Sequence, residues 1–536
     1  MEDRSKIIFG NEMSEQDYRK AEASKQRFIR KFGDDTNTEY PVFLRENACL
    51  GPVMGVQDII VGDPGRTTAE QPAQKAAEAA RQAAADIEKP AVQAAAGKEK
   101  PAVQAGAADK EPLQFDREKG IIVGNIRMGF GHYRISMAIA SAAHAQGYQP
   151  YWMDLNSYPE TTCTKVISAQ NDLYSMGSRI SQKSRAFNKV VWEPMNYEGF
   201  RKLSYNASDQ KNAELMAPVF RNIPKDIPLV GTHVWPAQAA LHGGMKTVVN
   251  AIPDNWPMAL HLSEGALHTV QTYNAYFGYR TLNGMHGKEI LNPMPSDSLI
   301  YTGHYIDHEL VSNIEEDCGS RVRRAQKDAP RRYLLTIGGA GAQKEIFGAI
   351  VRKLLPKLKQ KKAALFINIG DYRGVWDEYL SRIPLVRKLT KTYFNDWTAT
   401  QKFCEQAYQK DDLYGIHVFC HENIFEAVYA TNLLMRCCDV IVTKPSELSF
   451  YPVPKLFIQH IGGHERWGAI HSAEIGDGTI ECEDIPHTLQ MLDLIDSDNA
   501  VLQMLCDNIV RNKQTGVYDG AYRVVEAAFA RRAARC

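Results

Sequence analysis

Residues 121–132, IIVGNIRMGFGH, and residues 333–341, YLLTIGGAG, decide the fold of this chain. Each stretch begins with a short apolar run, typical of a buried parallel strand, and continues into glycines at the start of an expected helix. Glycine lets the backbone approach a ligand closely, and a helix N-terminus offers unpaired N–H groups and a partial positive charge. Glycines in such turns are often purely structural. Two such junctions, each opening its own α/β half, nevertheless predict a cleft between twin domains that holds a phosphate-bearing ligand.

The rest of the sequence continues the pattern of strand, loop and helix around both junctions. We expect strands over 149–155, 228–233 and 246–254 in the first half, and over 333–337, 364–369, 416–419, 440–443 and 455–459 in the second. Strands that alternate with helices form parallel sheets. The predicted fold class is therefore α/β, with two tandem Rossmann-like, doubly wound parallel-sheet domains, an interdomain cleft and a C-terminal helical segment.

Composition divides the chain into six parts. We expect an N-terminal extension that docks on the first domain (1–66), an Ala-rich disordered linker or insertion (67–113), a first Rossmann-like domain (114–310), a connector (311–330), a second Rossmann-like domain (331–485) and C-terminal helices that pack back across the domains (486–536). The Ala-rich part repeats EKPAVQ and has almost no large apolar side chains, so it cannot bury enough surface to offset its ordering entropy.

The bulk composition excludes several classes of protein. The 536 residues are 44% apolar and 24% charged with a net charge of zero, which is ordinary for a globular protein and gives no field that would attract nucleic acid. The ten cysteines show no metal-ligand spacing, so we expect no metal site and a reducing compartment. The N-terminus has no apolar signal segment and no run of about eighteen apolar residues occurs, so we expect a cytoplasmic protein that does not span a membrane.

Gly129, Gly131 and His132 form the chemically richest part of the first junction. A histidine at a helix N-terminus is disfavoured as a cation, and a neutral imidazole can accept a proton near pH 7. We therefore predict that His132 is catalytic and that the two glycines line an acceptor or phosphate loop. The alternative is a half-buried histidine that makes one hydrogen bond.

Two further polar residues follow expected strands of the first half. Asp254 lies in a loop edged by proline and tryptophan, where burial would raise the pKa of its carboxyl and suit it to act as a general base. A turn aspartate bonded to its own backbone is an equal alternative. His233 follows the preceding strand and is a third candidate beside His132, because ligands of open α/β sheets bind outside the carboxyl ends of strands.

The second half places its polar residues in two loops, within 439–449 (DVIVTKPSELS) and 459–469 (QHIGGHERWGA). Glu447 falls where a helix would begin and can accept two hydroxyls of a ribose. Ser446 can bind phosphate or cap that helix, but capping leaves Lys444 unexplained. His464 and Glu465 give the second loop more hydrogen-bonding capacity than a simple connection needs.

The order of these motifs resembles the GT-B fold, and in particular the family of monogalactosyldiacylglycerol synthases and the peptidoglycan N-acetylglucosaminyltransferase. The resemblance is carried by Gly131-His132, by Ile337-Gly338-Gly339, by Thr443-Lys444-Pro445-Ser446-Glu447 and by Gly463-His464-Glu465. Two departures stand out. The turn at 444–447 lacks the Gly-Pro-Gly-Thr of the lipid galactosyltransferases, and Arg466-Trp467 stands where related enzymes have Gln or Asn.

The resemblance implies a glycosyltransferase that moves a hexose from a UDP-sugar to an acceptor hydroxyl, with inversion and with no cofactor or metal. The second domain would bind the donor through residues in three loops, namely Gly338, Gly339, Gly341, Lys444, Ser446, Glu447, His464 and Glu465. The first domain would bind the acceptor, with His132 and Asp254 near the transferred sugar. A membrane glycerolipid, reached by peripheral contact with the inner face of a membrane, is one acceptor that this implies. A UDP-sugar epimerase-like enzyme of the same fold and a non-catalytic nucleotide-sugar-binding protein remain the alternatives.

Overall fold

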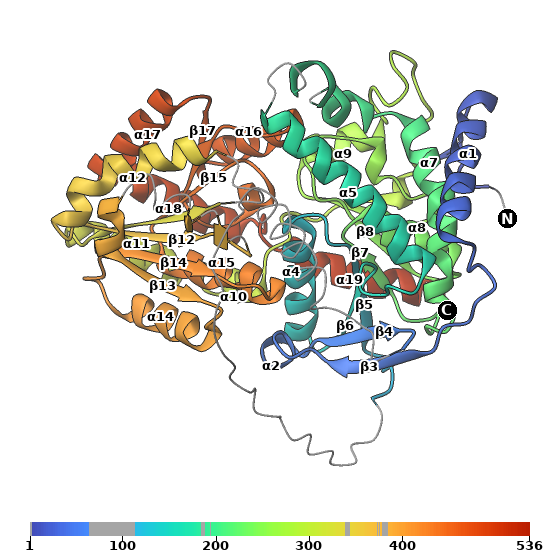
Figure 1. The fold of residues 1–536 in the computed structure, drawn as a ribbon, viewed down its shortest axis with the longest axis horizontal. Coiled ribbons are helices and arrows are strands. Elements are labelled where there is room, and N and C mark those ends of the chain that lie inside the picture. The colour runs from blue at the N-terminus through green and yellow to red at the C-terminus, as the bar shows by residue number, and fades with distance from the viewer. Residues whose placement is uncertain are drawn as a thin grey trace, which may run out of the picture.

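The computed structural model describes residues 3–63, 113–183, 188–192, 194–337, 343–371, 373–374, 376–377 and 384–535. The predicted Ala-rich insertion, 67–113, lies outside these residues except for Leu113. Two large sheets occupy opposite halves of the molecule, and α4 (Gly131–Ala145) stands between them (Figure 1). The predicted α/β fold class with two parallel-sheet domains is confirmed.

The first sheet has eight strands in the order β10-β9-β8-β7-β5-β6-β4-β3. They are β3 (Val42–Glu46), β4 (Gln57–Val61), β5 (Gly120–Asn125), β6 (Gln149–Asp154), β7 (Leu229–Gly231), β8 (Val248–Ala251), β9 (Leu267–Val270) and β10 (Leu299–Tyr301). All neighbours run parallel except β3, which pairs antiparallel with β4 at one edge. The central strand β5 is buried along its whole length, as its continuous apolar sequence predicts.

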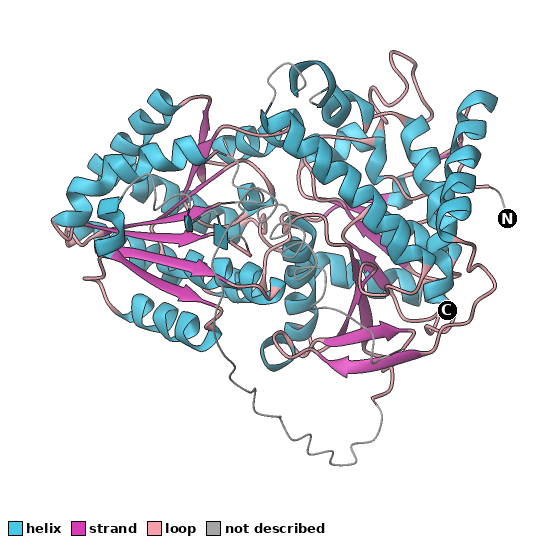
Figure 2. Ribbon diagram, viewed as in Figure 1, coloured by secondary structure: helices cyan, strands magenta, loops and turns pink. Residues whose placement is uncertain are grey.

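Helices cover both faces of the first sheet (Figure 2). They are α2 (Gly51–Met54), α4, α5 (Thr162–Lys183), α7 (Leu203–Ala213), α8 (Val234–His242) and α9 (Tyr273–Arg280), with the short helices η1 (Asn188–Trp192), η2 (Met195–Gly199), η3 (Glu214–Phe220), η4 (Ala259–His261) and η5 (Ser296–Ser298). Ile121 and Val123 of β5 pack in the apolar cluster of α4. Ile122 packs with α8 on the other face, since successive side chains of a strand alternate.

The N-terminal segment forms a hairpin, β1 (Ile7–Ile8) with β2 (Asn11–Glu12), and the helix α1 (Glu15–Phe32). Ser14 caps α1 by accepting a hydrogen bond from the Asp17 amide, and the first turn is acidic while the last is basic. Lys211 of α7 joins the segment to the first domain, because its ammonium lies 2.7 Å from Asp3 and 2.8 Å from Glu22. This contact fixes α1 against α7.

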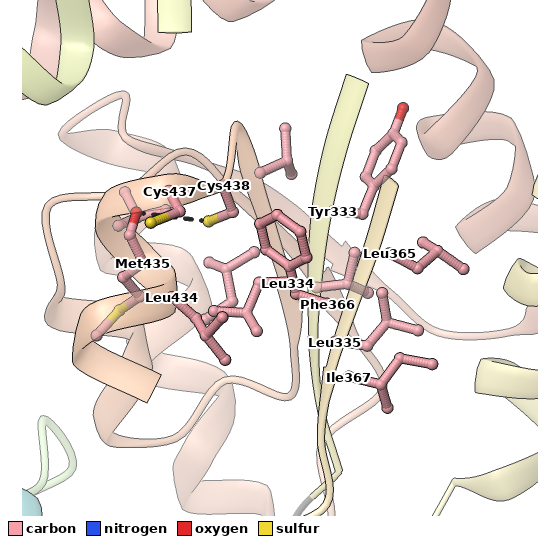
Figure 3. Packing of buried hydrophobic residues seen from close by; sticks show 14 of the residues in the cluster. Tyr333, Leu334, Leu335, Leu365, Phe366, Ile367, Leu434, Met435, Cys437 and Cys438 are labelled. Carbon is pink, nitrogen blue, oxygen red and sulfur yellow. Dashed lines mark hydrogen bonds between the residues drawn. The ribbon is translucent and has the colours of Figure 1, made fainter. Parts of the chain in front are cut away.

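The second sheet has seven parallel strands in the order β13-β14-β12-β11-β15-β16-β17. They are β11 (Arg331–Thr336), β12 (Ala363–Asn368), β13 (Thr390–Phe394), β14 (Gly415–Cys420), β15 (Val440–Thr443), β16 (Lys455–Ile458) and β17 (Gly478–Cys482). Leu334 and Phe366 point from this sheet toward Leu434 on α15 (Ile424–Cys437), while their strand neighbours point to the other face (Figure 3). Cys437 and Cys438 are buried free cysteines at the end of that helix.

The helices of the second half are α10 (His308–Ser312), α11 (Ile314–Gln326), α12 (Lys344–Lys359), α14 (Trp397–Gln409), α15, α16 (Arg466–Glu474), α17 (Ile485–Ser497) and α18 (Asn499–Gln514), with the short helices η7 (Pro384–Leu389), η8 (Glu447–Phe450) and η9 (Gly463–Glu465). The last helix, α19 (Gly520–Ala533), returns to the first domain. Helix α19 lies beside α4 (Figure 1). Ala521, Val524 and Val525 of α19 belong to the same buried cluster as residues of α4.

Between β10 and β11 the chain forms two helices, α10 and α11, in the region where the sequence predicted a connector over 311–330. Arg324 of α11 is buried and its guanidinium lies 2.7 Å from the carboxylate of Asp439, which is also buried. In the sequence, the charged residues of this region are typical of a solvent-exposed segment. In the structure, Arg324 is instead buried and paired with Asp439. No helix in the described part of the chain has the length and apolar character needed to cross a membrane.

Candidate functional site

Each sheet has one point where successive connections leave toward opposite faces, and the predicted site residues that the structure describes lie near these points. In the first sheet β5 is flanked by β6 and β7, and the chain leaves β5 for α4 and β7 for α8. In the second sheet β11 is flanked by β12 and β15. Thr336 at the end of β11 donates to Thr443 Oγ1 at the end of β15 over 3.0 Å. Ligands of open α/β sheets bind outside the strand ends at such points.

The first glycine turn lies against the second domain. Gly129 has a φ of +73°, a left-handed conformation that a residue with a side chain adopts only with strain. The ring of Phe130 approaches Gly370 so closely that a β-carbon on Gly370 would lie 2.7 Å from it. Gly131 begins α4, and a β-carbon there would lie 3.2 Å from Glu447 Oε2. The structure therefore brings together the first-domain turn and the second-domain Glu447.

A hydrogen bond to a backbone carbonyl group fixes the ring of His132. Its Nδ1 lies 2.7 Å from the carbonyl oxygen of Thr232, which can only accept, so Nδ1 donates and Nε2 of the neutral ring carries a free lone pair. Burial lowers the pKa of His132 below its ordinary value, although Thr232 and the nearby Asp254 act to raise it. This environment favours the neutral imidazole that the sequence predicted.

His233 lies beside His132, as the two ring centres are 4.9 Å apart at nearly right angles. It occupies the N-cap position of α8, where its Nδ1 accepts the Trp235 amide at 3.2 Å. Burial lowers the pKa of His233 well below its ordinary value, and the neighbouring His132 and His261 lower it further. The ring is therefore a neutral packing partner of His132 as well as a helix cap.

Asp254 has a partner that the sequence analysis missed. The His261 ring nitrogen Nε2 lies 2.9 Å from Asp254 Oδ2, and His261 is buried in η4. Burial acts to raise the pKa of Asp254, but the hydrogen bond and charge of His261, together with His464 and His132, outweigh it and hold the pKa at about 2. The expectation of a raised pKa is therefore wrong, because the burial of Asp254 is accompanied by three imidazoles.

Glu447 and Ser446 lie at the start of the one-turn helix η8. Ser446 occupies the N-cap position, but its side chain makes no capping hydrogen bond. Glu447 faces the first domain, where its Oε1 lies 3.7 Å from Nε of Arg134 on α4. Arg134 was not among the predicted residues, because nothing in the sequence of α4 shows that this buried arginine meets a residue three hundred positions later.

Lys444 and Glu465 form an ion pair between the two predicted donor loops. Burial acts to lower the pKa of Lys444, but Glu465 and Glu447 outweigh it and raise that pKa above its ordinary value. Glu465 Oε2 also accepts the amides of Ile461 at 2.9 Å and Gly462 at 3.3 Å, which orders the second loop. The adjacent His464 is near enough to Asp254 to help lower the pKa of that carboxyl.

Gly338, Gly339 and Gly341, the predicted diphosphate loop, lie outside the described residues. The chain is described up to Ile337, directly after β11, and again from Gln343, directly before α12. The described residues contain no group of three or more His, Cys, Asp and Glu side chains arranged to hold a metal ion.

Three further contacts join the domains around this site. Arg127 Nη2 lies 2.8 Å from Asp371 Oδ2, and both side chains are largely buried. Asn255 donates to the carbonyl oxygen of Trp467 at 2.8 Å. The rings of Trp256 and Trp467 stack with their centres 5.0 Å apart. None of these partners was predicted, because each pair depends on how the two domains face one another.

Comparison with solved structures gives distant similarities. The S. aureus MnaA–UDP co-structure is 13% identical, with 76% of this chain and 95% of that chain covered at a TM-score of 0.41. The UDP-GlcNAc 2-epimerase from Neisseria meningitidis bound to UDP-GlcNAc is 10% identical, with 77% and 98% covered at 0.40. The alpha,alpha-trehalose-phosphate synthase (UDP-forming) from Burkholderia vietnamiensis is 11% identical, with 77% and 100% covered at 0.38. These TM-scores are too low to indicate a function for this chain.

No curated protein matches this chain. Two family models match it in succession. Residues 294–529 match the model described as "Domain of unknown function (DUF6938)". Residues 7–281, just over half of the chain, match the model described as "Domain of unknown function (DUF6937)". The chain therefore belongs to the DUF6937 family, and most of its second half matches the DUF6938 model.

Proposed function

We propose that this protein is a glycosyltransferase that moves a hexose from a UDP-sugar to an acceptor hydroxyl, with inversion and without a metal ion. The observation that carries the proposal is the contact between Gly131 and Glu447. It sets the carboxyl-end edges of two parallel sheets against each other, with a neutral histidine on one side and a carboxylate on the other. A nucleotide bound by the second sheet would therefore present its sugar to the first.

The donor would be bound mainly by the second domain. Glu447 would accept the ribose hydroxyls, because it is a partly exposed carboxylate at the end of β15. Lys444 would face the diphosphate and share its charge between that group and Glu465. Ser446, His464 and the amides of Gly338, Gly339 and Gly341 complete the proposed donor set. Positioned cations and N–H groups of this kind can stabilise a leaving diphosphate.

The transfer step would use His132 as the base. Its Nε2 would take the proton of the acceptor hydroxyl while that oxygen bonds to the anomeric carbon of the sugar. The bond between the anomeric carbon and the β-phosphate oxygen would break, and UDP would leave with the electron pair. Asp254, with a pKa of about 2, is ionised at neutral pH and would stabilise the imidazolium as it forms.

The acceptor is proposed to be a membrane glycerolipid, because an apolar helix face borders the site. Leu173, Met176 and Ile180 are all exposed and lie on one face of α5. Tyr174 of the same helix is half-buried, which raises the pKa of its hydroxyl, and Glu465 and Asp254 raise that pKa further. The helix that carries the apolar face therefore lies close to the donor and acceptor residues, where peripheral contact with a membrane would deliver a lipid hydroxyl.

The test is to incubate the purified protein with UDP-glucose, UDP-galactose and UDP-N-acetylglucosamine, with and without phosphatidylglycerol vesicles that contain 10 mol% diacylglycerol. We expect UDP release and a new glycolipid only when vesicles are present. Release of UDP with an epimerised or free sugar in the absence of vesicles would identify the epimerase-like alternative instead. Binding of UDP without turnover of any of the three donors would identify a nucleotide-sugar-binding protein.

A further inference from the structure

Arg134 is a buried cation at a point where three parts of the chain meet. It lies on α4 of the first domain, and its Nη1 donates to Oδ1 of Asn432 on α15 at 3.0 Å. Its guanidinium lies 5.7 Å from the ring centre of Tyr451, which follows η8. Tyr451 in turn donates to Oδ2 of Asp307, on the segment that connects the sheets, at 3.1 Å. A first-domain cation is thus enclosed by groups of the second domain and of the connecting segment.

Two carboxyl groups lie near this cation, and they differ in environment. Burial raises the pKa of Asp307 to about 7, although Arg134 and the hydroxyl of Tyr451 act to lower it. A substantial part of Asp307 is therefore protonated at neutral pH and supplies less than a full negative charge. Glu447 is partly exposed toward the proposed donor site and lies 3.7 Å from Arg134 Nε. Glu447 is thus the main counter-ion of Arg134 on the side that faces the site.

The polar atoms around Arg134 are incompletely paired. Arg134 Nε, Asp307 Oδ1 and Asn432 Nδ2 are buried and have no hydrogen-bond partner among the described residues. Buried polar atoms without partners cost free energy, which favours rearrangements that pair them. A movement of less than about 1 Å would bring Nε and the Glu447 carboxylate within hydrogen-bond distance.

We infer that Arg134 is a positioning residue for Glu447, through which the first domain takes part in recognising the ribose of the donor nucleotide. Arg134 orients the carboxylate of Glu447 from the first-domain side. The hydrogen bond to Asn432 fixes the guanidinium of Arg134. The inference rests on the proposed function, since the ribose is the proposed partner of Glu447. The inference adds a residue that the resemblance does not imply. Arg134 belongs to the first domain, so the second domain alone would lack this support for Glu447.

The test compares the dissociation constants of UDP and 2′-deoxy-UDP by calorimetry with the full-length protein. We expect the unaltered protein to bind UDP about tenfold more tightly, as a hydrogen bond to a charged group provides. Arg134→Met should reduce this ratio to near one, and Glu447→Gln should do the same. Arg134→Lys should not restore it fully, because an ammonium cannot contact Asn432 and Glu447 in the same fork geometry.

Arg436→Met is the matched control. Arg436 lies on the same helix as Asn432 and pairs with Asp317 at 3.3 Å and Glu309 at 3.5 Å, so its removal breaks a comparable ion pair away from Glu447. We expect the ratio to stay near tenfold in this variant. A ratio unchanged in a folded Arg134→Met protein would overturn the inference and leave the proposed function standing.

Asn432→Leu provides a second route if Arg134→Met fails to fold. It removes the side chain that fixes the guanidinium of Arg134. We expect the ratio of the two dissociation constants to fall from about tenfold to about threefold or less. An unchanged ratio in this variant would also count against the inference. Failure of the unaltered protein to bind UDP at all, or equal binding of both nucleotides, would overturn the ribose role of Glu447 and this inference with it.

Discussion

The carboxylate of Glu447 lies directly against the backbone of Gly131, since Glu447 Oε2 is 3.2 Å from the place of a β-carbon on that glycine. The two residues come from the carboxyl edges of different sheets. A methyl group at position 131 would force the carboxylate to move by a few tenths of an ångström. The contact is therefore a sensitive point at which to test whether the two sheets share one ligand.

Gly131→Ala should weaken UDP binding about three- to tenfold while leaving the free energy of unfolding unchanged or up to about 1 kcal/mol higher, because alanine suits the first turn of α4. Gly129→Ala is the matched variant. Its φ of +73° strains any L side chain, yet nothing lies within 4 Å of the added β-carbon. It should lower the free energy of unfolding by about 1–2 kcal/mol. Calorimetry and urea unfolding of both variants would measure these effects, and a loss of stability in Gly131→Ala alone would contradict the argument.

His132→Ala should reduce the rate of sugar transfer about 10²- to 10⁴-fold, as loss of a general base does. UDP binding should change less than about threefold, because the proposed donor residues lie in the second domain. Single-turnover assays with saturating donor, paired with calorimetry, separate the two quantities. A variant that loses UDP binding in proportion to rate would show that His132 belongs to the donor site.

The pH dependence of transfer should have its acidic limb below pH 6.5. Burial lowers the pKa of His132 from its ordinary value of 6.5, and a base is active only when deprotonated. The midpoint of the acidic limb should therefore lie below pH 6.5. The measurement is kcat/KM between pH 5 and 8 in buffers of constant ionic strength. A limb centred above pH 7 would exclude His132 as the group that titrates.

Lys444→Met should reduce the preference for UDP over uridine about tenfold, because an ammonium contributes to binding a diphosphate and not to binding a nucleoside. Uridine affinity reports whether the loop itself is disturbed, since Glu465 also loses its partner in this variant. Competition binding with both ligands gives the ratio. Equal weakening of both would mean that Lys444 orders the loop and does not face the phosphates.

Asp209→Asn should stabilise the protein at alkaline pH. Asp209 is buried in α7, and burial raises the pKa of its carboxyl to about 8 even though Trp235 acts to lower it. The folded protein therefore binds a proton between about pH 4 and 8 that the unfolded chain releases, so this group makes stability fall as pH rises through that window. The asparagine cannot ionise, and the variant should gain a few kcal/mol over the unaltered protein at pH 8 and little at pH 4. Urea unfolding at both pH values checks this.

The central strands could be predicted because their apolar runs are continuous and rich in β-branched residues. Among the strands that follow residue 113, those that the sequence did not predict are β9, β10, β13 and β17. β13 and β17 are edge strands and carry exposed polar residues, as Lys391 shows. β9 contains His268, which is buried but satisfied, because its ring accepts the Ser263 amide at 2.9 Å and donates to Ser298 at 3.0 Å. A buried polar residue that is hydrogen-bonded in the folded protein interrupts the apolar run from which a strand would be predicted.

The candidate site was predictable to the extent that it lies at strand ends. His132, His233 and Glu447 each follow a central strand, and that position is visible in the sequence. Arg134 and His261 were missed for a physical reason, because their roles come from contacts with Glu447 and Asp254 and not from any local pattern. A single sequence specifies which residues end a strand more clearly than which residue faces them from another domain.

The return of α19 to the first domain has a consequence for how the chain matures. Its residues 520–533 complete the buried cluster around α4, so the first half of the protein cannot complete this cluster until residues 520–533 have been synthesised. While the second half is being synthesised, the alanine-rich face of α4 that α19 later covers is exposed to chaperones and proteases. Truncation of the chain before Gly520 would therefore destabilise the first domain, although the lost residues follow the second domain in the sequence.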